Sequence, residues 1–402
     1  MPLPNRGGPL AGVRVVELTK VWAGPYAGKL LAHLGAEVIK IESMSNLDEM
    51  RAYGGVDINS APYFLSINQE ILSVQVNMKT SEGLDLVRKM IAEADIFIDN
   101  IRPGAIERSK LSYEDLKKIK PDLIQCSIKM WGNDGPLGYQ TGYAPCFAAL
   151  SGLTNLVGYE GETPEGMNIR YGDSTVGALA ALACVAALHH RESTGEGQFI
   201  DHSAVESMTS LVGDSLFAYS LTGEVPQSDG NFHPEIAPHG AYPCADREWI
   251  SIACADESEW SAVCLVLGAQ ALASDARFAS LKLRLANRHS LDAELGALTA
   301  HHDAGALADQ LRRAGVPACR SQSSIDLCSD DYLWAREAFR MVSDHRNGAR
   351  PIIGPSWRME PDMALVERGA PLLGEHNDYV YREVLGLREA ELGDLIARKV
   401  VD

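Results

Sequence analysis

The first 130 residues alternate short apolar runs with segments whose apolar residues recur at helical spacing. Runs rich in β-branched residues predict strands at 13–18, 37–41, 73–76, 96–98 and 123–128. The intervening amphipathic segments predict helices at 24–34, 80–94 and 113–119. Because strands separated by helices of this length form βαβ units, we expect an α/β fold with a large Rossmann-like domain and a mostly parallel sheet.

The rest of the chain has a different pattern. A helical run of small residues at 178–190 is followed by a turn and short strand at 195–201 and a helix near 203–221. Residues 223–238 are rich in Gly, Pro, Asp and Asn, which indicates a linker. A strand at 249–253 and the helical segments after it predict a smaller α+β domain. Strand and turn character at 342–357 and a helix at 389–399 end the chain. We therefore divide the chain at residues 1–222, 223–330 and 331–402.

The composition is that of a globular protein without a basic surface. The 402 residues are 46% hydrophobic and 22% charged, and 54 acidic against 36 basic side chains give a formal charge of −18. We expect no nucleic-acid partner and no membrane, because nucleic acid and anionic lipid both require a basic footprint. The apolar run from Val176 to Leu188 is also expected to be too short to span a bilayer.

The eight cysteines and the N-terminus bear on the cellular compartment. The cysteines have no C-x-x-C spacing, and several of them lie in apolar runs, which favours free thiols in a reducing environment. The first residues contain no apolar core of a signal peptide. These features predict a cytoplasmic protein.

Familiar catalytic motifs are missing from the sequence. It has no P-loop, no convincing G-x-G-x-x-G after a strand, no H-E-x-x-H and no G-x-S-x-G. We therefore expect no metal site and no nicotinamide cofactor, which leaves catalysis by a carboxylate.

Asp173 is the carboxylate that the sequence singles out. It lies in Y-G-D-S-T-V-G at residues 171–177, which we expect to open the helix of small residues. Free N–H groups and the dipole at a helix N-terminus favour the ionised form of such a side chain. From the local sequence alone, Asp173 is either an ordinary N-cap or a nucleophile that attacks an acyl carbon.

Short segments in a specific order connect this aspartate to a known family. They are P-L (9–10), V-V-E-L (15–18), A-G-P (23–25), L-G-A-E-V-I-K-I-E (34–42), N-M-K-T (77–80), residues 100–108, G-D (172–173), T-G-E-G-Q (194–198), H-G-A-Y-P (239–243), G-V-P (315–317) and A-P-L-L-G-E-H (370–376). In this order and spacing the chain resembles the class III coenzyme A transferases. That family, also called the CaiB/BaiF type, includes formyl-CoA and carnitine CoA transferases.

The resemblance implies a covalent mechanism with Asp173 as the nucleophile. Its carboxylate attacks an acyl-CoA thioester to give an acyl-aspartyl anhydride, and the CoA thiolate then forms an aspartyl-CoA thioester. CoA and acyl-CoA would be substrates, and no tightly bound cofactor is expected. Exchange of a thioester for a carboxylate is close to thermoneutral, which agrees with the missing P-loop.

The resemblance also implies which residues line the CoA cleft and how the chain assembles. The candidate CoA-binding residues are Lys20, Val76, Asn100, Arg108 and Lys129. The family forms interlocked ring-shaped homodimers, in which the C-terminal segment 331–402 returns to the large domain. Association with a related chain in a hetero-oligomer stays open.

Two alternatives and one substrate hypothesis complete the expectations. An α-methylacyl-CoA racemase shares the fold, but its His-Asp pair is replaced by Tyr143-Ala144 here, and racemisation requires two acid/base groups. The chain could instead be one subunit of a heteromeric CoA transferase.

Arg170, three residues before Asp173, is a candidate for binding the distal carboxylate of a succinyl-CoA donor, and the acceptor would be an organic acid. Trp22 and Tyr143 are candidates for lining the acyl pocket.

Overall fold

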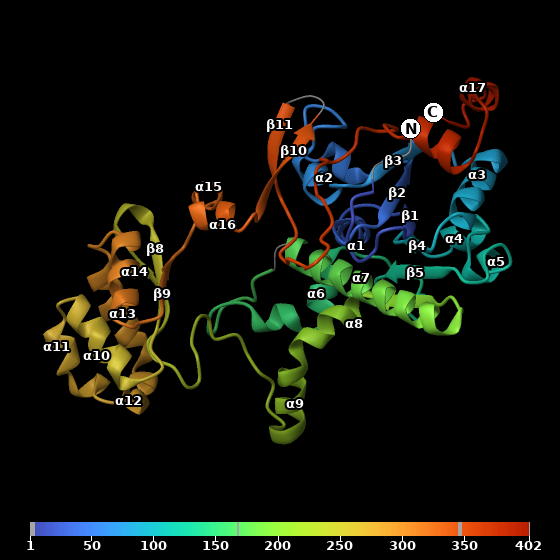
Figure 1. The fold of residues 1–402 in the computed structure, drawn as a ribbon. Coiled ribbons are helices and arrows are strands. Elements are labelled where there is room, and N and C mark those ends of the chain that lie inside the picture. Colours follow the sequence, from blue (N-terminus) through green and yellow to red (C-terminus); the bar gives the residue numbers. More distant parts are fainter. Residues whose placement is uncertain (1–4, 167–168, 345–347, 402) are drawn as a thin grey trace. The chain divides into compact units, whose positions relative to one another are not determined.

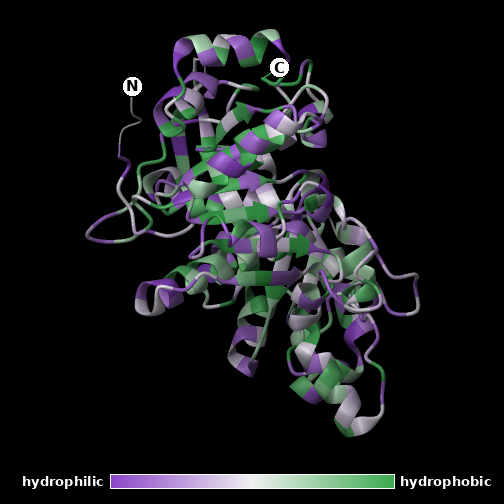
Figure 2. Cartoon of the chain, turned by 90° about the vertical axis from the view of Figure 1, so that its right-hand side faces the viewer, coloured by the Kyte–Doolittle hydropathy of each residue, from purple (hydrophilic) through white to green (hydrophobic). Residues whose placement is uncertain are grey.

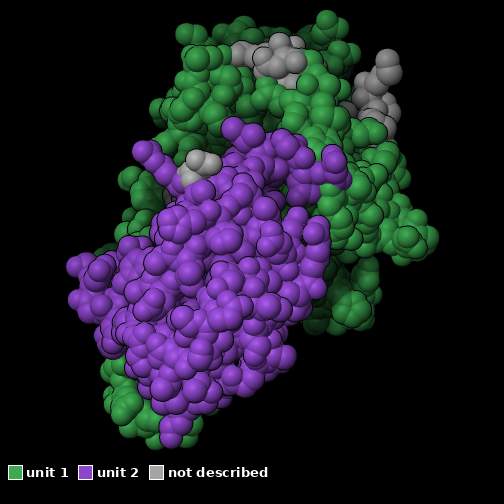
Figure 3. Space-filling view, turned by 90° about the vertical axis from the view of Figure 1, so that its left-hand side faces the viewer, with its two compact units in different colours: residues 1–154, 166–226, 332–402 green, residues 155–165, 227–331 purple. Residues whose placement is uncertain are grey.

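The computed structural model describes residues 5–166, 169–344 and 348–401. The chain separates into two compact units, which Figure 3 colours separately. Unit 1 comprises residues 1–154, 166–226 and 332–402, and unit 2 comprises residues 155–165 and 227–331. Residues 345–347, within the strand and turn segment predicted at 342–357, lie outside the described residues.

A six-stranded parallel sheet is the centre of unit 1 (Figure 1). Its strands are β1 (Arg14–Leu18), β2 (Glu37–Glu42), β3 (Leu72–Gln75), β4 (Ile96–Asp99), β5 (Ile124–Lys129) and β6 (Phe199–Ser203). The order is β3-β2-β1-β4-β5-β6, and each neighbouring pair is parallel. This confirms the predicted α/β fold. The order reverses between β1 and β4, and ligands of such sheets bind at the carboxyl ends of the strands on either side of this reversal.

Helices cover both faces of the sheet, so strands β1 to β5 are mostly buried, whereas the edge strand β6 is partly exposed. The helices of unit 1 are α1 (Ala23–His33), α2 (Pro62–Ile67), α3 (Ser81–Ala92), α4 (Ala105–Arg108), α5 (Tyr113–Leu116), α6 (Ala144–Leu150), α7 (Ile169–Thr194), α8 (Ala204–Thr209), α9 (Gly213–Thr222) and α17 (Glu389–Ala397). Successive strand residues enter different cores: Val15 packs with residues of α1 and α7, and Val16 packs with residues of α3. Figure 2 shows the resulting hydrophobic character of the strands.

Helix α7 begins earlier than the sequence predicts. It starts at Ile169, so Asp173 lies inside the helix, and the interpretation of Asp173 as an N-cap at the helix start is wrong. Gly172 is a packing position within the helix: a Cβ there would lie 3.2 Å from the Ala144 side chain. Gly177 similarly lets α7 approach α1, because a Cβ would lie 2.5 Å from the carbonyl oxygen of Ala23.

The earlier start also corrects the length expected for this apolar segment. Residues 170–194 are long and apolar enough to cross a membrane by length and composition. A core helix of a soluble protein has the same properties, and half of the most apolar window is buried inside the structure. Much of that burial comes from α1, against which α7 packs through its small residues.

The C-terminal segment packs against the β3 edge of the sheet. The imidazole Nδ1 of His376 accepts a hydrogen bond from the Ser73 N–H, and the Asn377 side chain accepts one from the Gln75 N–H. Residues 332–402 also contain the antiparallel pair β10 (Phe339–Asp344) and β11 (Gly348–Ile353), and a π-helical turn at Tyr379–Val384. Helix α16 (Asp331–Ala335) crosses the boundary between the units.

Unit 2 is a small α+β unit, as the sequence predicts. Its antiparallel sheet has the order β7-β8-β9, formed by β7 (His239–Pro243), β8 (Trp249–Ala253) and β9 (Ala318–Arg320). Its helices are α10 (Glu257–Val266), α11 (Gln270–Ala273), α12 (Leu281–Ala286), α13 (Arg288–Thr299), α14 (Ala304–Arg313) and α15 (Ser324–Cys328). The sheet and helices share one apolar core that includes Ile250, Trp260 and Leu295.

Candidate active site

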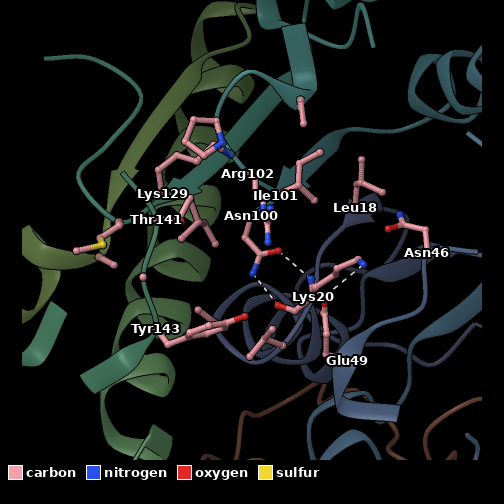
Figure 4. Close-up of a pocket in the computed structure, with 18 of the residues that line it drawn as sticks. Leu18, Lys20, Asn46, Glu49, Asn100, Ile101, Arg102, Lys129, Thr141 and Tyr143 are labelled. Atoms are coloured by element: carbon pink, nitrogen blue, oxygen red, sulfur yellow. Dashed lines mark hydrogen bonds and ion pairs between the residues drawn. The ribbon is translucent and has the colours of Figure 1, made fainter. Parts of the chain in front are cut away.

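A pocket of about 1040 Å³ opens at the carboxyl ends of β1, β4 and β5, where the strand order reverses. Its wall is completed by the segment that leads into α6 and by one face of α7. A volume of this size is at the upper end of what small-molecule sites in proteins have. All of its lining residues belong to unit 1, and Figure 4 shows how several of them are arranged.

Six of the nine candidate residues line this pocket, and three do not. The six are Lys20, Asn100, Arg108, Lys129, Tyr143 and Asp173. Val76 is buried in the core beneath α3, and Trp22 is buried with its indole N–H donating to the Ser174 hydroxyl at 3.0 Å. Arg170 is exposed on α7, one turn before Asp173.

Asp173 is a buried carboxylate within this pocket. Its side chain is 6% exposed, and Oδ2 has no hydrogen-bond partner among the described residues. Burial raises the pKa of the Asp173 carboxyl from 3.8 to about 7, and a hydrogen bond from the backbone of Ala23 opposes the rise. The sequence predicted a carboxylate held ionised by its own helix, which is wrong, since desolvation is the larger effect and the N–H comes from α1.

The N-terminus of α1 supplies the polar environment of Asp173. The first-turn N–H groups of Ala23 and Gly24 have no acceptor within the helix, and Pro25 has no N–H. Gly24 is required for close packing, because a Cβ there would lie 2.7 Å from the Thr19 side chain and 3.0 Å from that of Asn100. The start of α1 therefore has no side-chain cap, and the backbone of Ala23 there acts on the pKa of the neighbouring Asp173 carboxyl.

Asn100 holds the loop that precedes α1. Its Oδ1 accepts from the Lys20 N–H at 2.8 Å, and its Nδ2 donates to the Lys20 carbonyl at 2.7 Å (Figure 4). The Lys20 ammonium donates to the Leu47 carbonyl at 2.8 Å and lies 3.6 Å from Glu49. The sequence linked both residues to CoA, and in the structure each already has hydrogen-bond partners from other parts of unit 1.

Lys129 forms a buried ion pair with Asp99 at the base of the pocket. Burial raises the pKa of the Asp99 carboxyl even though the paired ammonium opposes this effect. A charge that is compensated in this way contributes little to binding a second anion. Lys129 thus lines the pocket as one half of a buried ion pair, and its predicted contact with CoA stays a prediction.

Three exposed cations at one part of the pocket have no such partner. Lys79, Arg102 and Arg108 line it, and within residues 5–166, 169–344 and 348–401 none of them forms an ion pair with a carboxylate. Of the three, the sequence analysis named only Arg108 as a CoA-binding candidate. Sequence reasoning missed Lys79, although it directly precedes Thr80, the N-cap of α3, and follows the carboxyl end of β3.

The fold and the pocket together define an α/β enzyme that binds an anionic ligand beside a buried carboxylate. Positive charge is concentrated in the pocket of a protein with a net charge of −18, and the carboxylate is the only strongly buried acid among its lining residues in the part of the chain that the structure describes.

The chain belongs to CoA-transferase family III, whose family model matches residues 10–377. A succinyl-CoA–D-citramalate CoA-transferase from Chloroflexus aurantiacus is 32% identical over 396 residues, with 98% of each chain covered. The alpha subunit of a succinyl-CoA–L-malate CoA-transferase from the same organism is 30% identical over 400 residues, covering 98% of this chain and 92% of the relative.

A solved structure agrees with this assignment. The CaiB/BaiF family protein from Brucella suis has a TM-score of 0.88 and 32% sequence identity, with 94% of this chain and 100% of that chain covered. The family match and these relatives confirm the expected family, and the protein is a CoA-transferase that uses CoA thioesters as substrates.

Proposed function

We propose that the protein transfers CoA from succinyl-CoA to a dicarboxylic acid through covalent intermediates on Asp173. The Asp173 carboxylate attacks the thioester carbon and expels CoA thiolate, which leaves a succinyl-aspartyl anhydride. The thiolate then attacks the aspartyl carbonyl, releases succinate and forms an aspartyl-CoA thioester. The acceptor carboxylate repeats the two steps in reverse, so that the acceptor leaves as its CoA thioester and Asp173 is regenerated.

The observation that carries this proposal is the position of the Asp173 carboxylate. It lies in the same pocket as the unpaired cations and beside backbone N–H donors of α1. A nucleophile needs an ionised oxygen, and burial without an ion pair leaves that oxygen poorly solvated and reactive. The N–H groups of Ala23 and Gly24 are candidates for stabilising the oxyanion of the tetrahedral intermediates.

The phosphates of CoA are proposed to bind the exposed cations Lys79, Arg102 and Arg108. CoA carries a pyrophosphate and a 3′-phosphate, which together need several positive partners. These three side chains are the charged groups of the pocket that are not already engaged by a described carboxylate. The thioester would then extend from this cationic part of the pocket toward Asp173.

Arg170 is proposed to receive the distal carboxylate of the succinyl group. It lies one turn before Asp173 on α7, so both side chains are on neighbouring positions of one helix face. Its guanidinium lies 5.4 Å from the centre of the Tyr63 ring, and Tyr63 contacts Trp22 edge to face at 5.9 Å. The two relatives described above are named for succinyl-CoA and for hydroxy dicarboxylic acids, which favours a dicarboxylic acceptor.

Trapping of the covalent intermediate tests the mechanism. The enzyme is mixed with succinyl-CoA and treated with hydroxylamine or borohydride, and the modified peptide is located by mass spectrometry. We expect modification at Asp173 and loss of CoA exchange in Asp173→Ala. Full exchange activity in Asp173→Ala would refute the proposed mechanism.

The racemase alternative is disfavoured by the composition of the pocket. Two-base exchange of an α-proton needs a second acid/base group, and no histidine occurs among the described residues that line the pocket. Exchange of the α-proton with deuterium from solvent, without movement of CoA between acids, would instead support racemisation.

We also propose a homodimer, interlocked as the family resemblance implies, in the cytoplasm. Helix α9 exposes Leu216 at 55%, Phe217 at 72% and Leu221 at 83%, and none of its described residues is buried. A second copy of this chain would cover such an apolar helix. Light scattering of the purified protein tests whether it is a dimer; a monomer that becomes active only with a related chain would support a hetero-oligomer.

The proposed cytoplasmic location agrees with the free cysteines of the structure. Cell fractionation tests this location.

A further inference from the structure

The turn between β1 and α1 has a strained backbone. Val21 adopts φ +67°, a left-handed conformation that is unfavourable for a β-branched residue. Val21 lines the pocket, and Ala23, two residues later, lines it together with Asp173. A strained conformation of this kind persists only where neighbouring groups determine it.

Side chains from three other parts of unit 1 hold this turn. The Lys40 ammonium, on β2, donates to the Thr19 carbonyl at 2.8 Å. Asn100, after β4, bonds both the N–H and the carbonyl of Lys20. Asp48 accepts a hydrogen bond from the Val21 N–H at 2.9 Å, directly at the strained residue. Consecutive peptide groups of the turn are thus fixed from outside.

Asp48 is itself held rigidly. Its Oδ1 also accepts from the Met50 N–H at 3.0 Å, and its Oδ2 lies 3.1 Å from the Lys40 ammonium. Asp48 and Lys40 are both buried, and Lys40 also lies 3.5 Å from the Glu17 carboxylate. A buried carboxylate with these partners has little freedom to move, which makes it a firm anchor for the N–H that it accepts.

We propose that Asp48 is a positioning residue of the transfer reaction, which holds the Val21 peptide so that the first N–H groups of α1 meet the reacting carboxylate of Asp173. The inference rests on the proposed function of Asp173. Without the acceptor at position 48, the Val21 N–H is unpaired and the turn relaxes toward negative φ. Such a relaxation displaces Ala23 and Gly24, and small displacements of oriented donors have large effects on rate.

Two substitutions at one position separate this role from a general effect of charge. Asp48→Asn and Asp48→Ala both remove the negative charge next to Lys40, but only the asparagine keeps an oxygen that accepts from the Val21 and Met50 N–H groups. We expect kcat/KM for succinyl-CoA to be roughly tenfold lower in Asp48→Ala than in Asp48→Asn, mainly through kcat.

The pH profile gives a second readout, because the Ala23 N–H favours the ionised form of Asp173. Burial and this N–H set the pKa of the Asp173 carboxyl, and the other charged side chains lining the pocket are Lys20, Glu49, Lys79, Arg102, Arg108 and Lys129. The acid limb of kcat/KM should move to higher pH in Asp48→Ala and stay near the wild-type position in Asp48→Asn. Equal kcat/KM and equal acid limbs in the two variants, at equal thermal stability, would overturn the positioning role.

A double-mutant cycle with Val21→Gly tests whether Asp48 acts through the strained backbone of Val21. Glycine adopts positive φ without strain, so Asp48→Ala should lower kcat/KM less in the Val21→Gly background than in the wild type. Full additivity would contradict the inference. Failure of the underlying mechanism has a different signature, since Asp173→Ala would then retain CoA exchange whatever residue occupies position 48.

Discussion

Ala23, at the start of α1, and Asp173, inside α7, line the same pocket, and the backbone of Ala23 lowers the pKa of the Asp173 carboxyl. Small residues make the contact possible: glycines at 24 and 177 allow the two helices and the β1–α1 turn to pack closely. The packing both buries the carboxylate and provides its donor. These two effects on the pKa of the Asp173 carboxyl act in opposite directions, and burial prevails.

Activity should decrease as the pH falls through about 7. The pKa of the Asp173 carboxyl is about 7, and only its ionised form is a nucleophile. We expect kcat/KM to fall tenfold per pH unit below that value, measured by CoA exchange between pH 5 and 9. An ordinary aspartate would give a flat profile over this range. Burial also raises the pKa of the Glu17 carboxyl to about 7, so Glu17→Gln is the control and should keep the acid limb.

Asp173→Asn should stabilise the folded protein at alkaline pH. The folded-state pKa of about 7 exceeds the ordinary value of 3.8, so the folded protein retains a proton between about pH 4 and pH 7 and loses stability as the pH rises through this window. The gain in the free energy of unfolding on replacing Asp173 by asparagine should be near zero at pH 4. It should reach at most about 4 kcal/mol at pH 8, because each unit of pKa difference corresponds to about 1.36 kcal/mol. Denaturant titrations at both pH values measure it; equal differences at pH 4 and pH 8 would contradict the raised pKa.

The sequence predicts the sheet well because its signal is local. Strands β1 and β2 are rich in Val and Ile and almost continuously buried, as expected for parallel strands covered on both faces, although each also contains charged residues. The start of α7 was mispredicted because the run of small residues begins only at residue 178, whereas the helix begins at Ile169 and Gly172 packs against Ala144 of α6. Local sequence contains no information about such a partner.

The site was predicted only in part for the same reason. The family resemblance named Lys20, Asn100 and Lys129, and all three line one pocket at the ends of β1, β4 and β5. Their partners are distant in sequence: Asp99 is thirty residues from Lys129, and the two meet because β4 and β5 are neighbours in the sheet. Whether a cation is free for a ligand therefore depends on register and packing, which residue types alone do not specify.

Removal of a single exposed cation should weaken CoA binding in a salt-dependent way. We expect Lys79→Gln and Arg108→Gln each to raise the KM for succinyl-CoA by about three- to tenfold at low salt, with a smaller effect at high salt because exposed charges are screened. The matched control is Lys118→Gln, whose exposed ammonium pairs with Asp115 outside the pocket. Unchanged KM in both pocket variants would place the phosphates elsewhere.

Arg170→Gln should affect donors with a free carboxylate selectively. A charge-assisted hydrogen bond contributes about 1.5–3 kcal/mol, so kcat/KM for succinyl-CoA should fall by about 10- to 100-fold. Butyryl-CoA has the same chain length without the second carboxylate, and its low activity should not change. The comparison variant is Arg108→Gln, which should affect both donors alike. A parallel loss with both donors in Arg170→Gln would show that Arg170 does not recognise the distal carboxylate.

Lys129→Met should destabilise the protein more than it impairs CoA binding. Lys129 pairs with Asp99 in the buried base of the pocket, so its removal leaves an uncompensated carboxylate. Loss of one partner of a buried pair costs about 3–5 kcal/mol, and the additional substitution Asp99→Asn should recover part of this loss. Denaturant titration of both variants, with the KM for succinyl-CoA measured in parallel, distinguishes a structural lysine from a ligand-binding one. A large rise in KM at unchanged stability would assign Lys129 directly to CoA, because only a side chain that contacts the ligand affects binding without affecting folding.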